Sequence, residues 1–239
     1  MLATMVAHRD ALAQNAKPIF DGRLTLTPTK LSSSEEKLMK DKVVPAARKS
    51  WHERERDQEC GTGFASTPTD IAAGSFTKPK SDQKAILYQY CEVGHDMTLN
   101  GIAVIENGQV VAHVVYEGGG DHAIGALPDI NGNGLSEILL AAGGTNQGIT
   151  WGSISIIELG GTEVTQFGRT ETLSDECGRA DDKNAKTKAY RISVKAGPSP
   201  AFYREVYSDS CEGSGTRKKV GGLTAISMDE DKVEYQLLK

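Results

Sequence analysis

The most informative segment of this sequence is ALPDINGNGLSEILLAA, residues 126–142, in which a polar loop runs directly into an apolar segment of strand length. A second segment of the same shape, GSFTKPKSDQKAILY at residues 74–88, aligns with residues 126–140 without a gap. Both have a small or apolar start, a polar loop and an apolar strand, although few residues are identical. Repeats at roughly 50-residue spacing are typical of β-propeller blades, which contain about four antiparallel strands each.

Short apolar segments separated by polar turns continue along the rest of the chain. Asn107-Gly108 lies between two of them and indicates a β-hairpin, because both residues of such a turn need a positive φ. The 26 glycines and the aromatic content of 6% also favour turns and short strands over long helices. The charged residues 179–188 are predicted to form a loop. The predicted strands are 85–91, 102–105, 110–116, 138–142, 153–159, 189–194, 202–207, 223–228 and 233–238.

The N-terminal part of the chain has a helical pattern. Ser33 and Glu36 have the spacing of a capping box, and apolar residues then recur at helical intervals as far as Trp51. Pro45 lies inside this pattern and is expected to kink the helix or divide it into two, since proline lacks the backbone N–H donor.

These patterns together predict a mainly β protein made of antiparallel, blade-like sheets with one N-terminal helical segment. The sheets would form either a small or incomplete β-propeller or an array of blade-like sheets packed on the helix. Residues 1–69 are expected to contain an extended segment and the helix that packs on the sheets. Residues 70–239 are expected to form the β-rich repeat domain.

Composition and charge are those of an ordinary globular chain, with 38% apolar and 25% charged residues among 239. The net charge of −5 gives no electrostatic reason to expect nucleic acid as a partner. No apolar stretch approaches the roughly 20 residues that a membrane-spanning helix needs. We therefore expect no direct membrane span.

The four cysteines favour two disulfides, with four buried free thiols as the alternative. None of them forms a CxxC pair and no histidine lies at zinc-ligand spacing from one, which disfavours a zinc site. Three pairings are possible, and pairing of neighbours along the chain would close two loops of similar size. Disulfides indicate an extracytoplasmic protein, periplasmic or secreted. Ala11-Leu-Ala13 resembles a signal-peptidase site, although no apolar segment precedes it. The cysteines are Cys60, Cys91, Cys177 and Cys211.

The polar loop at residues 129–137 has the pattern of a calcium-binding loop. It places oxygen-bearing side chains at alternate positions, a glycine where a sharp turn is needed, and a carboxylate at its end. Ca²⁺ prefers about 6–8 hard oxygen ligands, whereas Mg²⁺ demands stricter octahedral geometry. Softer metals are disfavoured because the loop contains neither sulfur nor imidazole. The predicted Ca²⁺ ligands are Asp129, Asn131, Asn133, the backbone carbonyl of Leu135, and Glu137.

An EF-hand shares the start of this pattern but requires a bidentate glutamate at the twelfth position and a helix on each side. The twelfth position is Leu140, and residues 138–142 are predicted to be a strand. Residues 129–140 instead resemble the calcium loop of FG-GAP repeats, which occur in the integrin alpha-subunit β-propeller and in many bacterial secreted proteins. The resemblance implies a loop that joins two strands of a blade, with the five ligands named above. The family's propellers usually have more blades than this chain can supply.

The earlier repeat departs from the calcium pattern. It has Thr77, Pro79, Ser81 and Ala85 at the four side-chain ligand positions. None of these side chains carries a carboxylate, which Ca²⁺ sites normally include. We therefore expect the earlier loop to be free of metal.

No motif for catalysis stands out. The sequence contains no GxSxG nucleophile elbow, no complete P-loop and no dinucleotide-binding fingerprint. The segment Gly118-Gly-Gly-Asp121-His122 could hold a ligand or share a proton between Asp121 and His122, but a flexible turn between blades explains it equally well. His113 is predicted to lie within a strand as a satisfied or surface imidazole.

The expected function is that of a non-catalytic, calcium-stabilised β scaffold. It would act as an extracytoplasmic binding or structural module, or as a subunit of a larger assembly, with a protein partner. The alternative is a hydrolase that uses Asp121 and His122 and holds calcium as a structural ion. A calcium sensor is disfavoured, because a loop between strands lacks the hinged helix pair that opens on binding.

Overall fold

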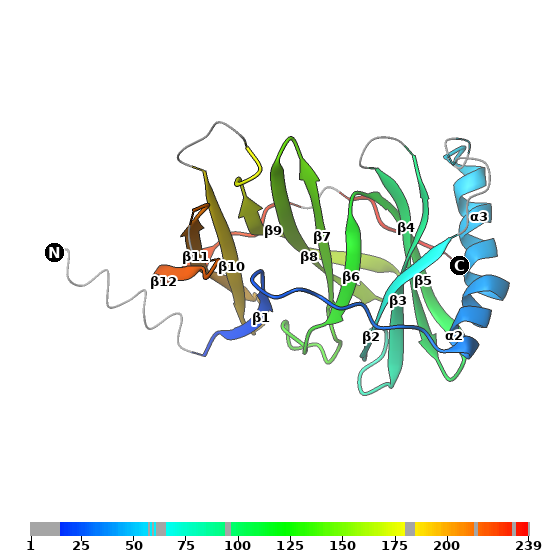
Figure 1. Cartoon of the computed structure of the whole chain (residues 1–239). Helices are drawn as coiled ribbons and strands as arrows, with labels where there is room; N and C mark the ends of the chain where they lie inside the picture. Colours follow the sequence, from blue (N-terminus) through cyan, green and yellow to red (C-terminus); the bar gives the residue numbers. More distant parts are fainter. Residues whose placement is uncertain are drawn as a thin grey trace.

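The computed structural model describes residues 15–56, 58, 60, 66–93, 97–179, 185–212, 215–230 and 233–238. Its strands form two antiparallel sheets and confirm the mainly β prediction (Figure 1). Among these residues no helix is long and apolar enough to cross a membrane. The Ala11-Leu-Ala13 segment lies outside the described residues.

The smaller sheet is an antiparallel meander in which each strand pairs with the next along the chain. The Asn107-Gly108 turn has φ angles of 51° and 74°, as the sequence predicted. A short C-terminal strand adds to the outer edge of β5. The strands are β2 (Thr67–Gly74), β3 (Gln83–Glu92), β4 (Thr98–Glu106), β5 (Gln109–Gly118) and β13 (Gln236–Leu237).

The larger sheet continues as a second meander from β6 to β12. β9 and β10 pair over only three residues, and β1 pairs with the rest of that edge of β10, so the sheet divides into two four-stranded groups. Neither sheet closes on itself among the described residues, which is compatible with an incomplete propeller. The strands are β1 (Lys17–Asp21), β6 (Asp121–Ala126), β7 (Ile138–Asn146), β8 (Ile149–Gly160), β9 (Glu163–Asp175), β10 (Lys186–Lys195), β11 (Ala201–Ser210) and β12 (Lys218–Ile226).

Three apolar clusters hold the layers of the molecule together. One packs the N-terminal helices, through Trp51, against the outer face of the smaller sheet. The second fills the space between that sheet and β6–β8, with Leu87 and Leu140 among its fully buried members. The third joins β7 and β8 to β10 and β11, so the larger sheet folds back on itself. The order of layers is therefore helix, small sheet, β6–β9, then β10–β12.

The helical segment consists of α2 (Ser33–Leu38), a π-helical turn η1 (Met39–Val43) and α3 (Val44–Glu53). The π turn accommodates Pro45, which lies at the start of α3 and could not donate to an α-helical hydrogen bond. Pro45 was predicted to kink the helix or to divide it in two. It does not divide the helix, because α2, η1 and α3 follow one another without a break from Ser33 to Glu53. The predicted capping box was wrong by one residue, because Ser32 is the N-cap and Glu35 completes the box.

Several strand predictions need correction. Residues 118–122 were explained equally well as a ligand site or as a flexible turn. Only residues 119–120 lie outside a strand, because β5 ends at Gly118 and β6 begins at Asp121. The charged residues 179–188 are not all loop, because β10 begins at Lys186. Residues 227–228 lie beyond the end of β12, and only 236–237 of the predicted last strand are in a sheet. β1, β2, β6 and β9 were not predicted.

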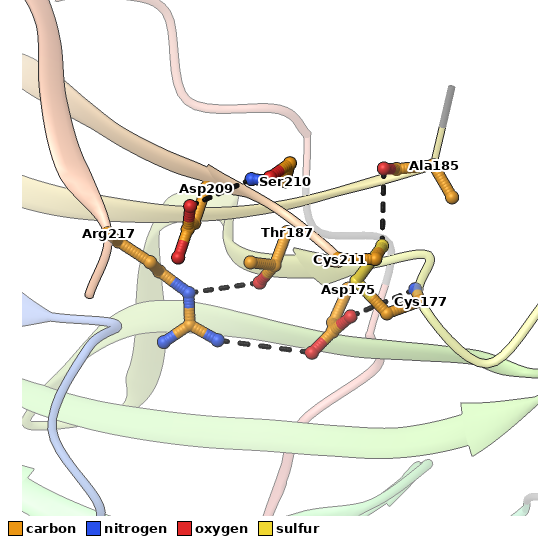
Figure 2. Close-up of a disulfide and its surroundings, with 8 residues drawn as sticks. All are labelled: Asp175, Cys177, Ala185, Thr187, Asp209, Ser210, Cys211 and Arg217. Atoms are coloured by element: carbon orange, nitrogen blue, oxygen red, sulfur yellow. Dashed lines mark hydrogen bonds and ion pairs between the residues drawn. A yellow bond between two sulfur atoms is a disulfide. The ribbon is translucent and has the colours of Figure 1, made fainter. Parts of the chain in front are cut away.

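Both disulfides form between neighbours along the chain, and no described cysteine is free. Cys60–Cys91 lies at the helix-facing side of the smaller sheet. Cys177–Cys211 joins the segment after β9 to the end of β11 (Figure 2). Beside it, Arg217 donates to Thr187 at 2.9 Å and pairs with Asp175 at 3.9 Å, so polar contacts support the same junction.

Candidate functional site

The predicted calcium loop joins β6 to β7 and is anchored at both ends. The Leu127 N–H donates to the Glu137 carbonyl at 2.8 Å, which closes the base of the loop. Ile130 is buried in the cluster between β7–β8 and β10–β11, and its carbonyl accepts the Gly197 N–H at 2.8 Å. An apolar anchor within a polar loop fixes the backbone, because moving it would expose the buried side chain.

Asp129 organises the polar part of the loop. Its carboxylate accepts the N–H groups of Gly132 at 2.6 Å, Gly134 at 2.7 Å and Asn133 at 3.2 Å. Gly134 has a φ of +89°, a conformation that favours glycine. Burial alone would raise the pKa of Asp129, but the donors of Gly134, Gly132 and Asn133 hold it below its usual value. Asp129 is therefore fixed as an anion.

Asn131 and Asn133 are oriented by a carboxylate that the sequence reasoning missed. The amide nitrogens of both donate to Glu158 Oε2 at 2.8 Å. Their amide oxygens accept the N–H groups of Asn133 at 3.1 Å and Leu135 at 2.9 Å. Glu158 lies on β8 and is only 4% exposed. In the sequence, the one sign of this role is that Glu158 is an acidic residue among the apolar residues of that strand.

Glu137 is fully buried at the end of the loop. Both of its carboxylate oxygens accept the Ile130 N–H, at 3.2 and 3.1 Å. Burial, with smaller contributions from the neighbouring carboxylates of Glu158 and Asp129, raises the pKa of Glu137 to about 7 against the opposing effect of the Ile130 N–H. No ion pair among the described residues includes Glu137 or Glu158.

The corresponding loop of the smaller sheet is closed by a neutral side chain, which lies two residues earlier in the alignment than Glu137. Residues 75–82 join β2 to β3, and the buried Gln83 accepts the Phe76 N–H at 2.9 Å and the Thr77 N–H at 3.0 Å. Gln83 and Glu137 thus each bond to a backbone N–H seven residues earlier. Since a neutral amide closes the first loop, closure alone does not explain why the second has a carboxyl group there.

The oxygen-rich set around this loop fits a hard divalent cation in its chemistry. Asp129, Glu137 and the two asparagines come from the loop, and Glu158 adds a carboxylate from β8. No described group of three acidic, histidine or cysteine side chains could hold a metal by itself. Any ion here would therefore also need amide and backbone oxygens, such as the predicted carbonyl of Leu135, as Ca²⁺ sites commonly do.

The two loops contact each other directly. The Ser136 N–H donates to the Ser75 carbonyl at 2.9 Å, and the Ser75 N–H donates to the Ser136 hydroxyl at 3.1 Å. Nearby, a Cβ at Gly134 would lie 3.2 Å from Pro79, so the loops are in close contact. Residues 127–137 therefore connect both sheets as well as β10–β11 through Gly197.

The two histidines that were considered for catalysis, His113 and His122, lie on different strands. His113 is buried within β5, where its Nε2 lies 2.5 Å from the Tyr88 hydroxyl, and burial lowers its pKa to about 4. Asp121 accepts the Tyr116 hydroxyl at 2.8 Å, and His122 Nδ1 lies 3.0 Å from the Gly120 carbonyl. Asp121 and His122 both line a cavity at the end of β6 opposite the loop.

No family model matches this chain, and neither a curated protein nor a solved structure does. The resemblance to FG-GAP repeats therefore depends on residues 129–140 alone.

Proposed function

We propose that this protein is a non-catalytic β scaffold stabilised by Ca²⁺, which serves as an extracytoplasmic binding or structural module or as a subunit of a larger assembly. The observation that carries the proposal is the pair of buried carboxylates, Glu137 and Glu158, beside the anionic Asp129. A buried carboxyl group is normally protonated, paired with a cation or bound to a metal, and the raised pKa of Glu137 reflects the cost of ionising it without a partner. Ca²⁺ would supply the positive charge that the described side chains do not.

The choice of Ca²⁺ over other ions follows from the ligand atoms. All candidate ligands are oxygens, which excludes a preference for soft metals. Amide and carbonyl ligands on an irregular loop suit the flexible coordination of Ca²⁺ better than the octahedral demand of Mg²⁺. With two carboxylates in the loop itself, we expect an affinity in the range of extracellular modules, about 10⁻⁴–10⁻³ M.

The contacts of the loop support a scaffold function. Its Ser136 is bonded to Ser75 in the smaller sheet, and its Ile130 to Gly197 beyond β10. An ion that rigidified residues 129–137 would therefore stiffen the junction of three strand groups. A ligand that binds only the folded state stabilises that state by mass action. The free energy of unfolding rises by about 2.7 kcal/mol when the free ligand concentration is a hundred times Kd.

The two disulfides support an extracytoplasmic location, since such bonds persist mainly in oxidising compartments. A Kd of about 10⁻⁴–10⁻³ M is also typical of extracellular Ca²⁺ modules, whereas cytosolic Ca²⁺ sites bind more tightly. A secreted or periplasmic scaffold with a protein partner accounts for both features.

Calorimetry and thermal unfolding test the proposal. Ca²⁺ added to protein stripped with a chelator should bind with measurable heat and raise the Tm, and Mg²⁺ should do so much less. Glu137→Gln and Asp129→Asn should lose both responses, because each removes a charge from the site. Asp82→Asn, in the equivalent loop of the other sheet, is the matched control and should respond like the wild type. Absence of heat and of a Tm shift with the wild type would contradict the proposal.

A hydrolase is the second candidate, because Asp121 and His122 line one cavity as that function requires. A neutral ester such as p-nitrophenyl acetate is a suitable probe of this activity. Turnover above the buffer rate that disappears in His122→Ala would favour the hydrolase. Equal rates for the wild type and this variant would leave the scaffold as the better account.

A further inference from the structure

A polar cavity of about 470 Å³ opens between the two sheets. It lies where β6 begins and β7 ends, whereas the calcium loop lies where β6 ends and β7 begins. Residues of β2, β3 and β4 form one wall, and residues of β6, β7 and β8 form the other. Elsewhere the same two sheets pack against each other through apolar side chains.

Glycines keep this end open and shape it around one aromatic side chain. Gly144 pairs with Trp151 across β7 and β8, and a Cβ at Gly144 would lie 3.4 Å from the indole ring. Gly120 has a φ of +72°, and a Cβ there would lie 2.8 Å from the Gly143 carbonyl. A side chain at Gly120 would force the start of β6 away from β7, whereas a Cβ at Gly144 would only make ordinary contact with the indole. The half-buried indole is thereby held as part of the wall.

The polar groups of the wall are held in place by hydrogen bonds. The Asp121 carboxylate accepts the Tyr116 hydroxyl at 2.8 Å. The Thr98 hydroxyl donates to the Gly118 carbonyl and accepts from Asn100, both at 2.8 Å. Groups fixed before binding lose less freedom when a ligand arrives, which favours recognition.

The charge of the lining selects the class of ligand. Glu92 and Asp121 are acidic, and no lysine or arginine is among the residues that the structure places around the cavity. An anion would therefore be repelled. The Arg169 guanidinium carbon lies 5.8 Å from the centre of the Trp151 ring, so a second positive charge placed beside the indole would be repelled by it. A neutral ligand avoids both costs.

We infer that this cavity binds a neutral saccharide of one or two rings. Sugar hydroxyls both donate and accept, which matches carboxylates beside the Gln89 amide and several threonine hydroxyls. The indole of Trp151 offers an apolar surface for the C–H face of a ring. The volume falls within the roughly 300–1,000 Å³ of small-molecule sites. This site is independent of calcium binding.

Three sugars with the same ring and different charge test the inference. Glucose, glucosamine and glucuronate, with cellobiose as a two-ring probe, are titrated into the protein by calorimetry. Glucose or cellobiose should bind with saturation, at least about tenfold more tightly than glucuronate and more tightly than glucosamine. Trp151→Ala should weaken that binding at least about tenfold, and Trp151→Tyr only about threefold.

Val111→Ala is the matched control, because it trims an exposed apolar side chain on β5 outside this cavity. It should bind like the wild type, and melting curves should show that every variant remains folded. The inference is overturned if neither neutral sugar saturates, if glucosamine or glucuronate binds best, or if binding survives in a folded Trp151→Ala variant.

Discussion

We predict that the free energy of unfolding of this protein falls between pH 8 and pH 5, and that replacing His113 by glutamine removes a substantial part of that fall. His113 is 5% exposed and its Nε2 lies 2.5 Å from the fully buried Tyr88 hydroxyl, which can donate to Nε2 when that nitrogen carries no proton. Burial lowers its pKa from 6.5 to about 4. The unfolded chain therefore binds a proton below pH 6.5 that the folded chain does not accept until about pH 4.

The magnitude follows from that difference in pKa. A base with a lowered folded pKa leaves stability unchanged above pH 6.5 and reduces it as pH falls through the interval down to about 4. The full interval is worth about 3 kcal/mol, of which about 2 kcal/mol is lost by pH 5. Glutamine is neutral throughout and its carbonyl oxygen can still accept from Tyr88.

The assay is urea unfolding of wild type and His113→Gln at pH 8 and pH 5. Other titrating groups act in both proteins, so their effects cancel in the comparison. The free energy of unfolding of the wild type should fall by about 2 kcal/mol more than that of the variant. His52→Gln, which changes an exposed histidine of α3, should behave like the wild type. Equal pH dependence in wild type and His113→Gln would refute the reasoning.

Further predictions concern the packing of the layers. Asp70→Ala should lower the free energy of unfolding by about 3 kcal/mol in urea titrations, because its buried carboxylate accepts backbone N–H groups from three segments; an unchanged midpoint would contradict this. Gly101→Ala should cost about 1–3 kcal/mol by thermal unfolding, since a Cβ there would overlap the Tyr88 ring, and a neutral effect would show that the ring can move. Replacing Cys177 and Cys211 by serine should cost about 4 kcal/mol in the loop-entropy model, and a loss below about 1 kcal/mol would indicate residual structure in the unfolded chain.

Local signals in the sequence predicted the elements that depend on local chemistry. The Asn107-Gly108 turn and the π turn of the helix next to Pro45 each follow from backbone restrictions on one or two residues. The repeated loops were also recognisable, because residues 74–88 and 126–140 both form a strand end, a loop and a strand. The N-cap is Ser32 rather than Ser33, since Ser32 and Glu35 have the same capping-box spacing, and the element is unchanged.

The elements that escaped prediction depend on contacts between distant segments. β9, with the sequence EVTQFGRTETLSD, is polar along most of its length and is a strand because it pairs with β8. β6 follows three glycines, so its sequence resembles a turn, and its structure comes from pairing with β7. Glu158 lies outside the loop motif, and only folding brings its carboxylate to Asn131 and Asn133.

A crystal structure grown in millimolar CaCl₂ tests the calcium site most directly. The account predicts an anomalous peak with oxygens of Asp129, Asn131, Asn133, Glu137 and the Leu135 carbonyl at about 2.3–2.6 Å from it. Residues 129–137 with only water among their side chains, in crystals soaked at saturating Ca²⁺, would contradict it.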